Sequence, residues 1–311
     1  MGEMVCASAC RADGSQAAER EGGMMGEPSY ADAVSAHYTA GDLGDTILVS
    51  LRAAGLDPDA LQVEALAPLD QFHTGGADAT RALIRRAGLQ PGMRVLDVGG
   101  GLGGPARLIA HEAGCTVTVL DLSEESCRVG AWLTARVGLA DRVAFRCGSA
   151  LAIPFADGAF DMVWTQHAAL NIAEKERLYR EIHRVLRPGG RLAMQEMMAG
   201  TVGPLHFPVP WAGDASISFL QPAAEIRALL ADVGFREVEW VDEREAVLSG
   251  MQVPVPGEPP RGPRPFAALV LGPRLPEMQR NAARNLREDR LTPVQAVFER
   301  LGVATNRPHP S

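Results

Sequence analysis

The sequence has few features of a membrane protein, a nucleic-acid binder or a secreted protein. No apolar run approaches the roughly 18 residues of a membrane span, and the first residues lack the basic start and apolar centre of a signal peptide. The formal net charge is −8 and no run of basic residues occurs, which argues against a nucleic-acid partner. The five cysteines show no metal-type spacing. We therefore predict no membrane partner, no metal site and a cytoplasmic location.

Hydrophobic patterning divides the 311 residues into three parts. Residues 1–28 have no hydrophobic period and are predicted to be a disordered leader. Residues 29–90 combine helical spacing with the segment LDQFHTGG and are predicted to form an N-terminal helical cap. Residues 91–311 are predicted to form the main domain, with an insertion at about 250–290 that begins proline-rich and ends in a helix.

Strand and helix patterns alternate beyond residue 91, which predicts an α/β fold with a parallel sheet and helices on both faces. A first apolar run begins at Met93 and ends at an acid, Asp97. The later strands are expected at residues 116–120, 142–147, 160–164, 191–197, 235–241 and 293–300. Helices are expected at 77–87, 173–186 and 223–233.

A glycine-rich loop follows the first strand directly. Gly99, Gly101 and Gly104 satisfy the spacing G-x-G-x-x-G. This spacing is typical of a loop that binds a dinucleotide pyrophosphate at the start of the following helix. Alternatively, the glycines serve only to pack the strand tightly against that helix. Asp97 favours a different ligand, because its carboxylate would repel a pyrophosphate but would attract an ammonium group. A second acid, Asp121, ends the next strand 24 residues later, near the interval at which such folds bind ribose hydroxyls.

Several linked motifs resemble those of class I S-adenosylmethionine-dependent methyltransferases that act on small molecules. They are DVGGGLGG, PFADGAFDMVW and REIHRVLRPGGRLAM. LDQFHTGG and WTQHAALNI are similar to the branch that contains sarcosine/dimethylglycine-type N-methyltransferases. The resemblance implies a Rossmann-like seven-stranded sheet, a cap whose last segment covers the cofactor, and a lid inserted before the last strand.

The same resemblance implies a set of residues around S-adenosylmethionine. Asp97, Gly99 and Gly101 would surround the methionyl end, with Gln166 beside the methionyl or ribose end, while Asp121 and Leu122 would meet the ribose and adenine, and Ser149 and Ala150 would border the adenine. Ser149 departs from the pattern, because many relatives place an acid there. A hydroxyl accepts a hydrogen bond without charge assistance and should bind the adenine less strongly.

Candidate catalytic and substrate residues follow from where the motifs place them. His73 and His167 are the candidate catalytic residues, each weighed against a structural role. Candidate substrate contacts are Tyr38, Gln71, Asn171, His206 and Trp211. No arginine stands out in these segments to hold a substrate carboxylate, which argues against a glycine-like acceptor.

The predicted function is methylation of a small-molecule acceptor, with nitrogen favoured as the acceptor atom. An O- or C-methyltransferase of specialised metabolism is the first alternative. A nicotinamide-dependent oxidoreductase would bind NADH in place of S-adenosylmethionine, and a regulatory protein with this fold would bind the cofactor without turnover. The oligomeric state is left open, with a homodimer as one option.

Overall fold

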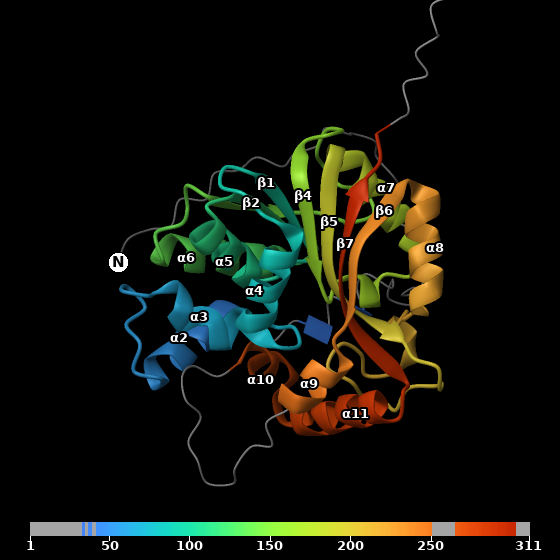
Figure 1. Cartoon of the computed structure of the whole chain (residues 1–311). Coiled ribbons are helices and arrows are strands. Elements are labelled where there is room, and N and C mark those ends of the chain that lie inside the picture. Colours follow the sequence, from blue (N-terminus) through green and yellow to red (C-terminus); the bar gives the residue numbers. More distant parts are fainter. Residues whose placement is uncertain (1–32, 35–36, 39–41, 251–264, 303–311) are drawn as a thin grey trace, which may run out of the picture.

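A mixed seven-stranded sheet forms the centre of the protein, in the strand order β3-β2-β1-β4-β5-β7-β6 (Figure 1). The computed structural model describes residues 33–34, 37–38, 42–250 and 265–302, so the predicted leader and the proline-rich part of the insertion lie outside it. The strands are β1 (Arg94–Val98), β2 (Thr116–Asp121), β3 (Val143–Cys147), β4 (Phe160–Gln166), β5 (Leu186–Ala199), β6 (Phe235–Asp242) and β7 (Leu291–Arg300). β7 is antiparallel to β5 and β6, and the other neighbours are parallel.

Helices cover both faces of the sheet and its carboxyl edge (Figure 1). One face carries α4 (Gly76–Ala87), α5 (Gly104–Ala113) and α6 (Glu124–Arg136), and the other carries α7 (Lys175–Val185) and α8 (Ala223–Val233). The edge is covered by α2 (Leu43–Ala53), α3 (Val63–Asp70), α9 (Arg244–Gly250), α10 (Phe266–Leu271) and α11 (Leu275–Arg287). Short 3-10 turns occur at η1 (Ala169–Asn171), η2 (Ala215–Ile217) and η3 (Gly272–Arg274).

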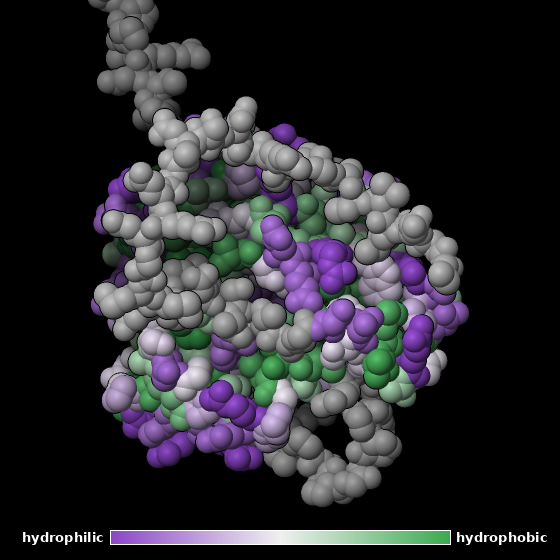
Figure 2. All heavy atoms as spheres, turned by 180° about the vertical axis from the view of Figure 1, so that it is seen from behind, coloured by the Kyte–Doolittle hydropathy of each residue, from purple (hydrophilic) through white to green (hydrophobic). Residues whose placement is uncertain are grey.

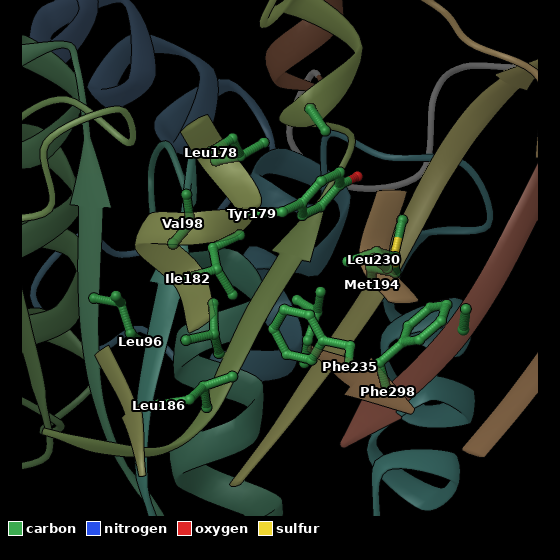
Figure 3. Packing of buried hydrophobic residues seen from close by; sticks show 14 of the residues in the cluster. Leu96, Val98, Leu178, Tyr179, Ile182, Leu186, Met194, Leu230, Phe235 and Phe298 are labelled. Carbon is green, nitrogen blue, oxygen red and sulfur yellow. The ribbon is translucent and has the colours of Figure 1, made fainter. Parts of the chain in front are cut away.

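Alternate strand residues pack into two separate layers, because successive side chains of a strand point to opposite faces. Leu96 and Val98 of β1 lie in one cluster with α7 and α8 (Figure 3), whereas Val95 lies in the other with α4 and α5. All three side chains are almost completely buried. The glycine loop therefore starts from a strand that is held on both faces.

The cap and the insertion share one hydrophobic cluster at the carboxyl edge. It contains leucines of α2 and α3, Leu102 of the glycine loop, Val129 and Leu133 of α6, and Phe266 of α10. Phe72, which follows α3, meets Phe266 edge to face with ring centroids 5.5 Å apart. Segments separated by almost 200 residues thus form one cover over the edge where the parallel strands end (Figure 1).

The fold class expected from the sequence is confirmed, but the sheet is mixed rather than parallel, because β7 runs antiparallel to both of its neighbours. Most elements begin and end within two residues of their predicted limits. β5 is the main difference, since it begins at Leu186 rather than at Arg191. Leu186 pairs with Phe160 of β4, and the register shifts between Phe160 and Met162, so an irregular pairing extends the strand back through RPGG. The boundaries of the cap and of the main domain stay predictions.

Among the described residues, no helix is both long and apolar enough to cross a membrane. Hydrophilic and hydrophobic residues are intermixed over the described part of the face opposite to that of Figure 1 (Figure 2). The homodimer stays a prediction.

Candidate active site

A cavity of about 1240 Å³ lies at the carboxyl edge of the sheet, between the strand ends and the cover. Its walls include residues from the ends of β1, β2 and β4, from the loop after β3, and from α11. Pockets that hold one drug-sized ligand usually measure ~300–1,000 Å³. This cavity therefore has room for a cofactor and a second molecule.

The glycine loop brings bare main chain to the cavity. Gly101 has φ 53°, and a Cβ built on it would meet nothing within 4 Å. The other two motif glycines are needed for packing: a Cβ on Gly99 would lie 2.4 Å from Cβ of Ala168, and one on Gly104 would lie 2.3 Å from the carbonyl oxygen of Asp70. The motif thus combines one open position with two positions that let the cover and the η1 turn approach closely.

Asp97 ends β1 as a buried carboxyl group on the cavity wall. Its Oδ2 atom has no hydrogen-bond partner among the described residues. Burial, together with the neighbouring Asp121 carboxylate, raises the pKa of Asp97 to about 7. An unpaired buried carboxylate is costly to ionise, so a cationic group placed beside it would stabilise its charged form.

Asp121 ends β2 with its carboxylate held by main-chain donors. Oδ2 accepts from the N–H of Gly101 at 2.8 Å, and Oδ1 accepts from the N–H of Ser123 at 2.9 Å. Each oxygen keeps a further lone pair for a hydroxyl group. The next residue, Leu122, lines the cavity although its side chain is 46% exposed, which offers an apolar surface for a flat ring.

Ser149 and Ala150 lie in the loop after β3 and line the same cavity. The Ser149 hydroxyl accepts from the N–H of Leu151 at 3.1 Å. Its own O–H remains available as a donor.

A buried polar network lies behind the cavity wall at Gln166. Gln166 Nε2 donates to Oε1 of Gln195 at 2.7 Å, and its Oε1 accepts from Nε1 of Trp164 at 2.8 Å. His73 joins this network, because its Nε2 lies 2.9 Å from Gln71 Oε1 and its Nδ1 lies 3.3 Å from Gln166 Nε2. Both ring nitrogens of His73 are therefore engaged by protein groups, and burial lowers its pKa to about 4.

His167 differs from His73 although the two rings stand only 6.3 Å apart, edge to face. Its Nε2 is buried without a partner among the described residues. Its backbone has φ 56°, a left-handed conformation that is strained for a residue with a Cβ and is frequent at functional sites. Burial, with His73 as a smaller contribution, lowers the pKa of His167 to about 3, so the ring is neutral at physiological pH.

Two buried charged residues fix the turn that follows His167. Glu196 Oε1 accepts from the N–H groups of Ala168 and Ala169 at 3.2 and 3.1 Å. Lys175 Nζ donates to the carbonyls of Ala169 and Phe219 at 2.7 and 2.8 Å. Neither residue was predicted, since their sequence positions resemble ordinary strand and helix positions.

Comparison with known proteins agrees with this geometry. Residues 96–194 match a family model described as a methyltransferase domain. The matched segment runs from β1 into β5 and includes Asp97, Asp121, Gln166 and His167.

The named relatives of this chain are methyltransferases whose names indicate different acceptors. Methyltransferase GfsG of Streptomyces halstedii is 35% identical over 130 residues, 42% of this chain and 47% of that protein. Sarcosine/dimethylglycine N-methyltransferase of Halorhodospira halochloris is 32% identical over 171 residues, 53% of this chain and 61% of that protein. Other relatives are named as sterol 24-C-methyltransferases and as a probable tocopherol O-methyltransferase. The matches thus span only about half the length of the first two relatives.

A solved structure shares the fold over most of this chain. Phosphoethanolamine N-methyltransferase 2 of Haemonchus contortus, in complex with S-adenosyl-L-methionine, superposes with a TM-score of 0.62 at 21% identity. The match covers 89% of this chain and 61% of that one. The class I methyltransferase fold expected from the sequence is therefore shown.

The structure brings all but one of the predicted site residues to the cavity. Tyr38 and Asn171 form a pair there, with the Tyr38 hydroxyl 2.8 Å from Asn171 Oδ1. The Asn171 amide donates to the carbonyls of Trp211 and Ile217, so Asn171 serves mainly to hold the loop that carries Trp211. Trp211 and Gln71 also line the cavity.

His206 is the predicted substrate residue that the structure does not bring to the cavity wall. Its Nε2 lies 2.8 Å from Glu288 Oε2, and its main-chain N–H donates to Asn285 Oδ1 at 2.8 Å. His206 therefore attaches its loop to the end of α11. Its sequence position, after the fifth strand, placed it in the correct loop but could not reveal which way the loop turns.

Two functional features were missed in the sequence. Arg107 of α5 and Asp70 of α3 form a buried ion pair at 2.7 Å, which ties the cap to the glycine-loop helix. Arg280 and Arg287 of α11 line the cavity, outside the segments in which no arginine was expected to meet a substrate carboxylate. Only the position of α11 over the strand ends reveals them.

Proposed function

We propose that the protein transfers a methyl group from S-adenosylmethionine to a small molecule. The observation that carries this proposal is Oδ2 of Asp97, which is buried without a partner among the described residues, on the wall of a cavity that the glycine loop also lines. The carboxylate complements the ammonium group of an amino-acid end, and the glycine loop, which leads into the N-terminus of α5, lets such an end approach the main chain. A ligand with an ammonium group would restore the missing partner of Asp97.

The remaining predicted cofactor residues fit the rest of the same molecule. Asp121 keeps lone pairs for two ribose hydroxyls, Leu122 presents an exposed apolar side chain beside them, and Ser149 offers a hydroxyl at the far end. S-Adenosylmethionine, when bound, supplies an electrophilic methyl group. The cover formed by cap and insertion would exclude water and hold the acceptor in line, which in favourable cases contributes about 7–11 kcal/mol to catalysis.

The acceptor atom that we propose is an amine nitrogen. His167 Nε2 can accept a hydrogen bond from the acceptor and thereby orient it. With a pKa of about 3, however, this ring is a weak base, since each pKa unit below neutrality costs about 1.4 kcal/mol on protonation. A neutral amine attacks without giving up a proton first, whereas a phenol or an acidic carbon needs a base.

A hydroxyl group is the second candidate, and His167 supports it as well. The ring is neutral and lies in the cavity with a free lone pair, as a general base requires. A large dependence of turnover on His167 would favour this reading over the amine. We do not favour a nicotinamide-dependent oxidoreductase, because Asp97 would face the pyrophosphate.

Calorimetric titration distinguishes a methyltransferase from a nicotinamide-dependent oxidoreductase by the cofactor that each binds. We expect S-adenosylhomocysteine to bind and NADH not to bind. Asp121→Ala should weaken the binding of S-adenosylhomocysteine by about 1.5–3 kcal/mol, the range for hydrogen bonds to charged groups. Binding of NADH in preference to S-adenosylhomocysteine would refute the proposal. Incubation with labelled S-adenosylmethionine and a metabolite extract, followed by mass spectrometry, would then identify the acceptor.

A further inference from the structure

The cavity wall on α11 carries two cations that the cofactor does not require. Arg280 and Arg287 both line the cavity. They are seven residues apart, so they lie on one face of the helix about 10.5 Å from each other along its axis. Ala283 lies between them on the same face and also lines the cavity, and both arginines are exposed.

Two neighbouring arginines are paired with Glu288: Arg284 lies 2.7 Å from one oxygen of its carboxylate, and Arg290 lies 2.7 Å from the other. Within the described part of the chain, no ion pair involves Arg280 or Arg287. Cations that line a cavity without a counter-charge attract an anionic ligand.

The charges of the cavity are distributed unevenly. The carboxyl groups of its described wall belong to the cap and the strand ends, namely Asp70, which is paired with Arg107, and Asp97 and Asp121, which we assign to the cofactor. The two histidines of this wall are neutral at physiological pH. The α11 side is therefore the cationic end of the cavity.

The surface near the two arginines is mostly apolar. Phe266 of α10, Leu275 and Leu286 of α11, and Met197 of β5 line the same cavity. A molecule that fills this region would bury a hydrocarbon body while a charged end meets the guanidinium groups.

We propose that α11 is the acceptor-recognition helix, and that Arg280 and Arg287 bind a carboxylate or phosphate group on a mainly apolar acceptor. The inference rests on the proposed methyltransferase function, because it assigns the other end of the cavity to the cofactor. According to this inference, the acceptor is an amphiphilic organic anion that binds with its reactive atom toward His167.

Direct binding tests this assignment without a known acceptor. Decanoate and decyl phosphate serve as anionic probes and decanol serves as the neutral one, each titrated into the protein saturated with S-adenosylhomocysteine. We expect at least one anionic probe to bind more tightly than decanol, with an affinity that falls as salt rises. The preference between decanoate and decyl phosphate distinguishes a carboxylate from a phosphate site.

Variants locate the site. Arg280→Gln combined with Arg287→Gln should weaken the preferred anionic probe by about ten- to a hundredfold, the loss expected for charge-assisted hydrogen bonds. Arg284→Gln on the same helix is the matched control and should leave probe binding unchanged. Affinity for S-adenosylhomocysteine should be the same in the parent, the double variant and the Arg284→Gln control, which shows that the variants are folded.

Three results would overturn the inference: decanol binding as tightly as both anions, no anionic probe binding at millimolar concentration, or equal probe affinity in the double variant and the parent. A failure of S-adenosylhomocysteine to bind the parent would instead refute the proposed function. The two failures are thus distinguishable in one set of titrations.

Discussion

At the scale of single residues, the buried Asp97 carboxyl group should make the free energy of unfolding depend on pH. Its pKa of about 7 exceeds the usual 3.8, so the folded state retains a proton that the unfolded state has lost. The free energy of unfolding should therefore decrease as pH rises from about 4 to 7, and the full penalty should persist above pH 7.

Asp97→Asn should remove this penalty and also the attraction for an ammonium group. We expect the variant without cofactor to be more stable than the parent by about 1–4 kcal/mol at pH 8, and nearly equal to it at pH 4. S-Adenosylhomocysteine should bind about 1.5–3 kcal/mol more weakly. Urea unfolding at both pH values and calorimetry measure the two effects. A variant that is less stable at pH 8 and binds the cofactor normally would show that Asp97 has an internal partner.

His167 should affect the rate of methylation without setting its pH dependence. Because its pKa is about 3, the ring does not titrate between pH 6 and 8. His167→Ala should lower kcat by about tenfold or more at saturating cofactor, and the pH profile should keep its shape. His167→Asn tolerates the left-handed backbone and offers an amide oxygen, so it should retain more activity.

Two outcomes would revise the assignment of His167. A loss of a hundredfold to ten-thousandfold in both variants would show that the ring is a general base and would favour a hydroxyl acceptor. An unchanged kcat in both would remove His167 from the reaction. His73→Asn is the matched comparison, since His73 lies in the same wall with both nitrogens engaged.

The strand-end residues could be placed at the cavity from the sequence, whereas the hydrogen-bond partners of the loop residues could not be predicted. Asp97 and Asp121 follow apolar runs, and parallel strands bring such ends to one edge. His73 and His167 look alike in sequence, yet only one has a free nitrogen. That difference arises from Gln71 and Gln166, whose side-chain directions depend on packing across the whole edge.

At the scale of elements, the buried pair of Arg107 and Asp70 should dominate the attachment of the cap. Arg107→Met leaves the Asp70 carboxylate buried without its partner, so we expect a loss of about 3–5 kcal/mol in the free energy of unfolding. Adding Asp70→Asn should recover part of this loss. Arg81→Met, which breaks the more exposed pair with Glu112, is the control and should cost about 1 kcal/mol or less. Urea denaturation compares them, and equal losses at the two sites would contradict this interpretation.

The segment between α3 and α4 should respond to the cofactor. Gln71, Phe72, His73 and Thr74 all line the cavity. We expect amide protection in residues 66–76 to rise when S-adenosylhomocysteine binds, because the ligand removes open states of a cover that closes over it. Hydrogen exchange measures this, with α8 as an internal control because its residues are not among those that line the cavity. Protection that rises only in the glycine loop would leave residues 66–76 without a cofactor role.

Element limits were predictable where local chemistry marks them. Ser123 caps α6 by accepting from the N–H of Ser126 at 3.1 Å, as its position before two acids predicts. The early start of β5 was not predictable, because RPGG is a typical turn sequence and its pairing with β4 depends on tertiary contacts.

At the scale of the whole molecule, the seven-stranded sheet followed from the family resemblance, whereas the strand order and the residues that line the cavity required the structure. The sequence patterns of the cap and the insertion predict helices, but they do not predict where these helices lie relative to the sheet. Placement of α11 over the strand ends turned two ordinary surface arginines into cavity residues. Long-range placement of this kind depends on contacts such as that of Phe72 with Phe266.

The contact between Phe72 and Phe266 also bears on how new acceptor specificities could arise. The insertion enters and leaves the fold between β6 and β7, so it could be exchanged with that of a relative without altering the cofactor residues. Phe266, however, belongs to the same cluster as the cap leucines. In a chimaera, the cover would therefore stay closed only if the donor insertion had an aromatic residue at the position of Phe266, or if the donor's cap were transferred as well. When acceptor specificity changes during evolution of this fold, the cap and the insertion, which are far apart in the sequence, should thus change together.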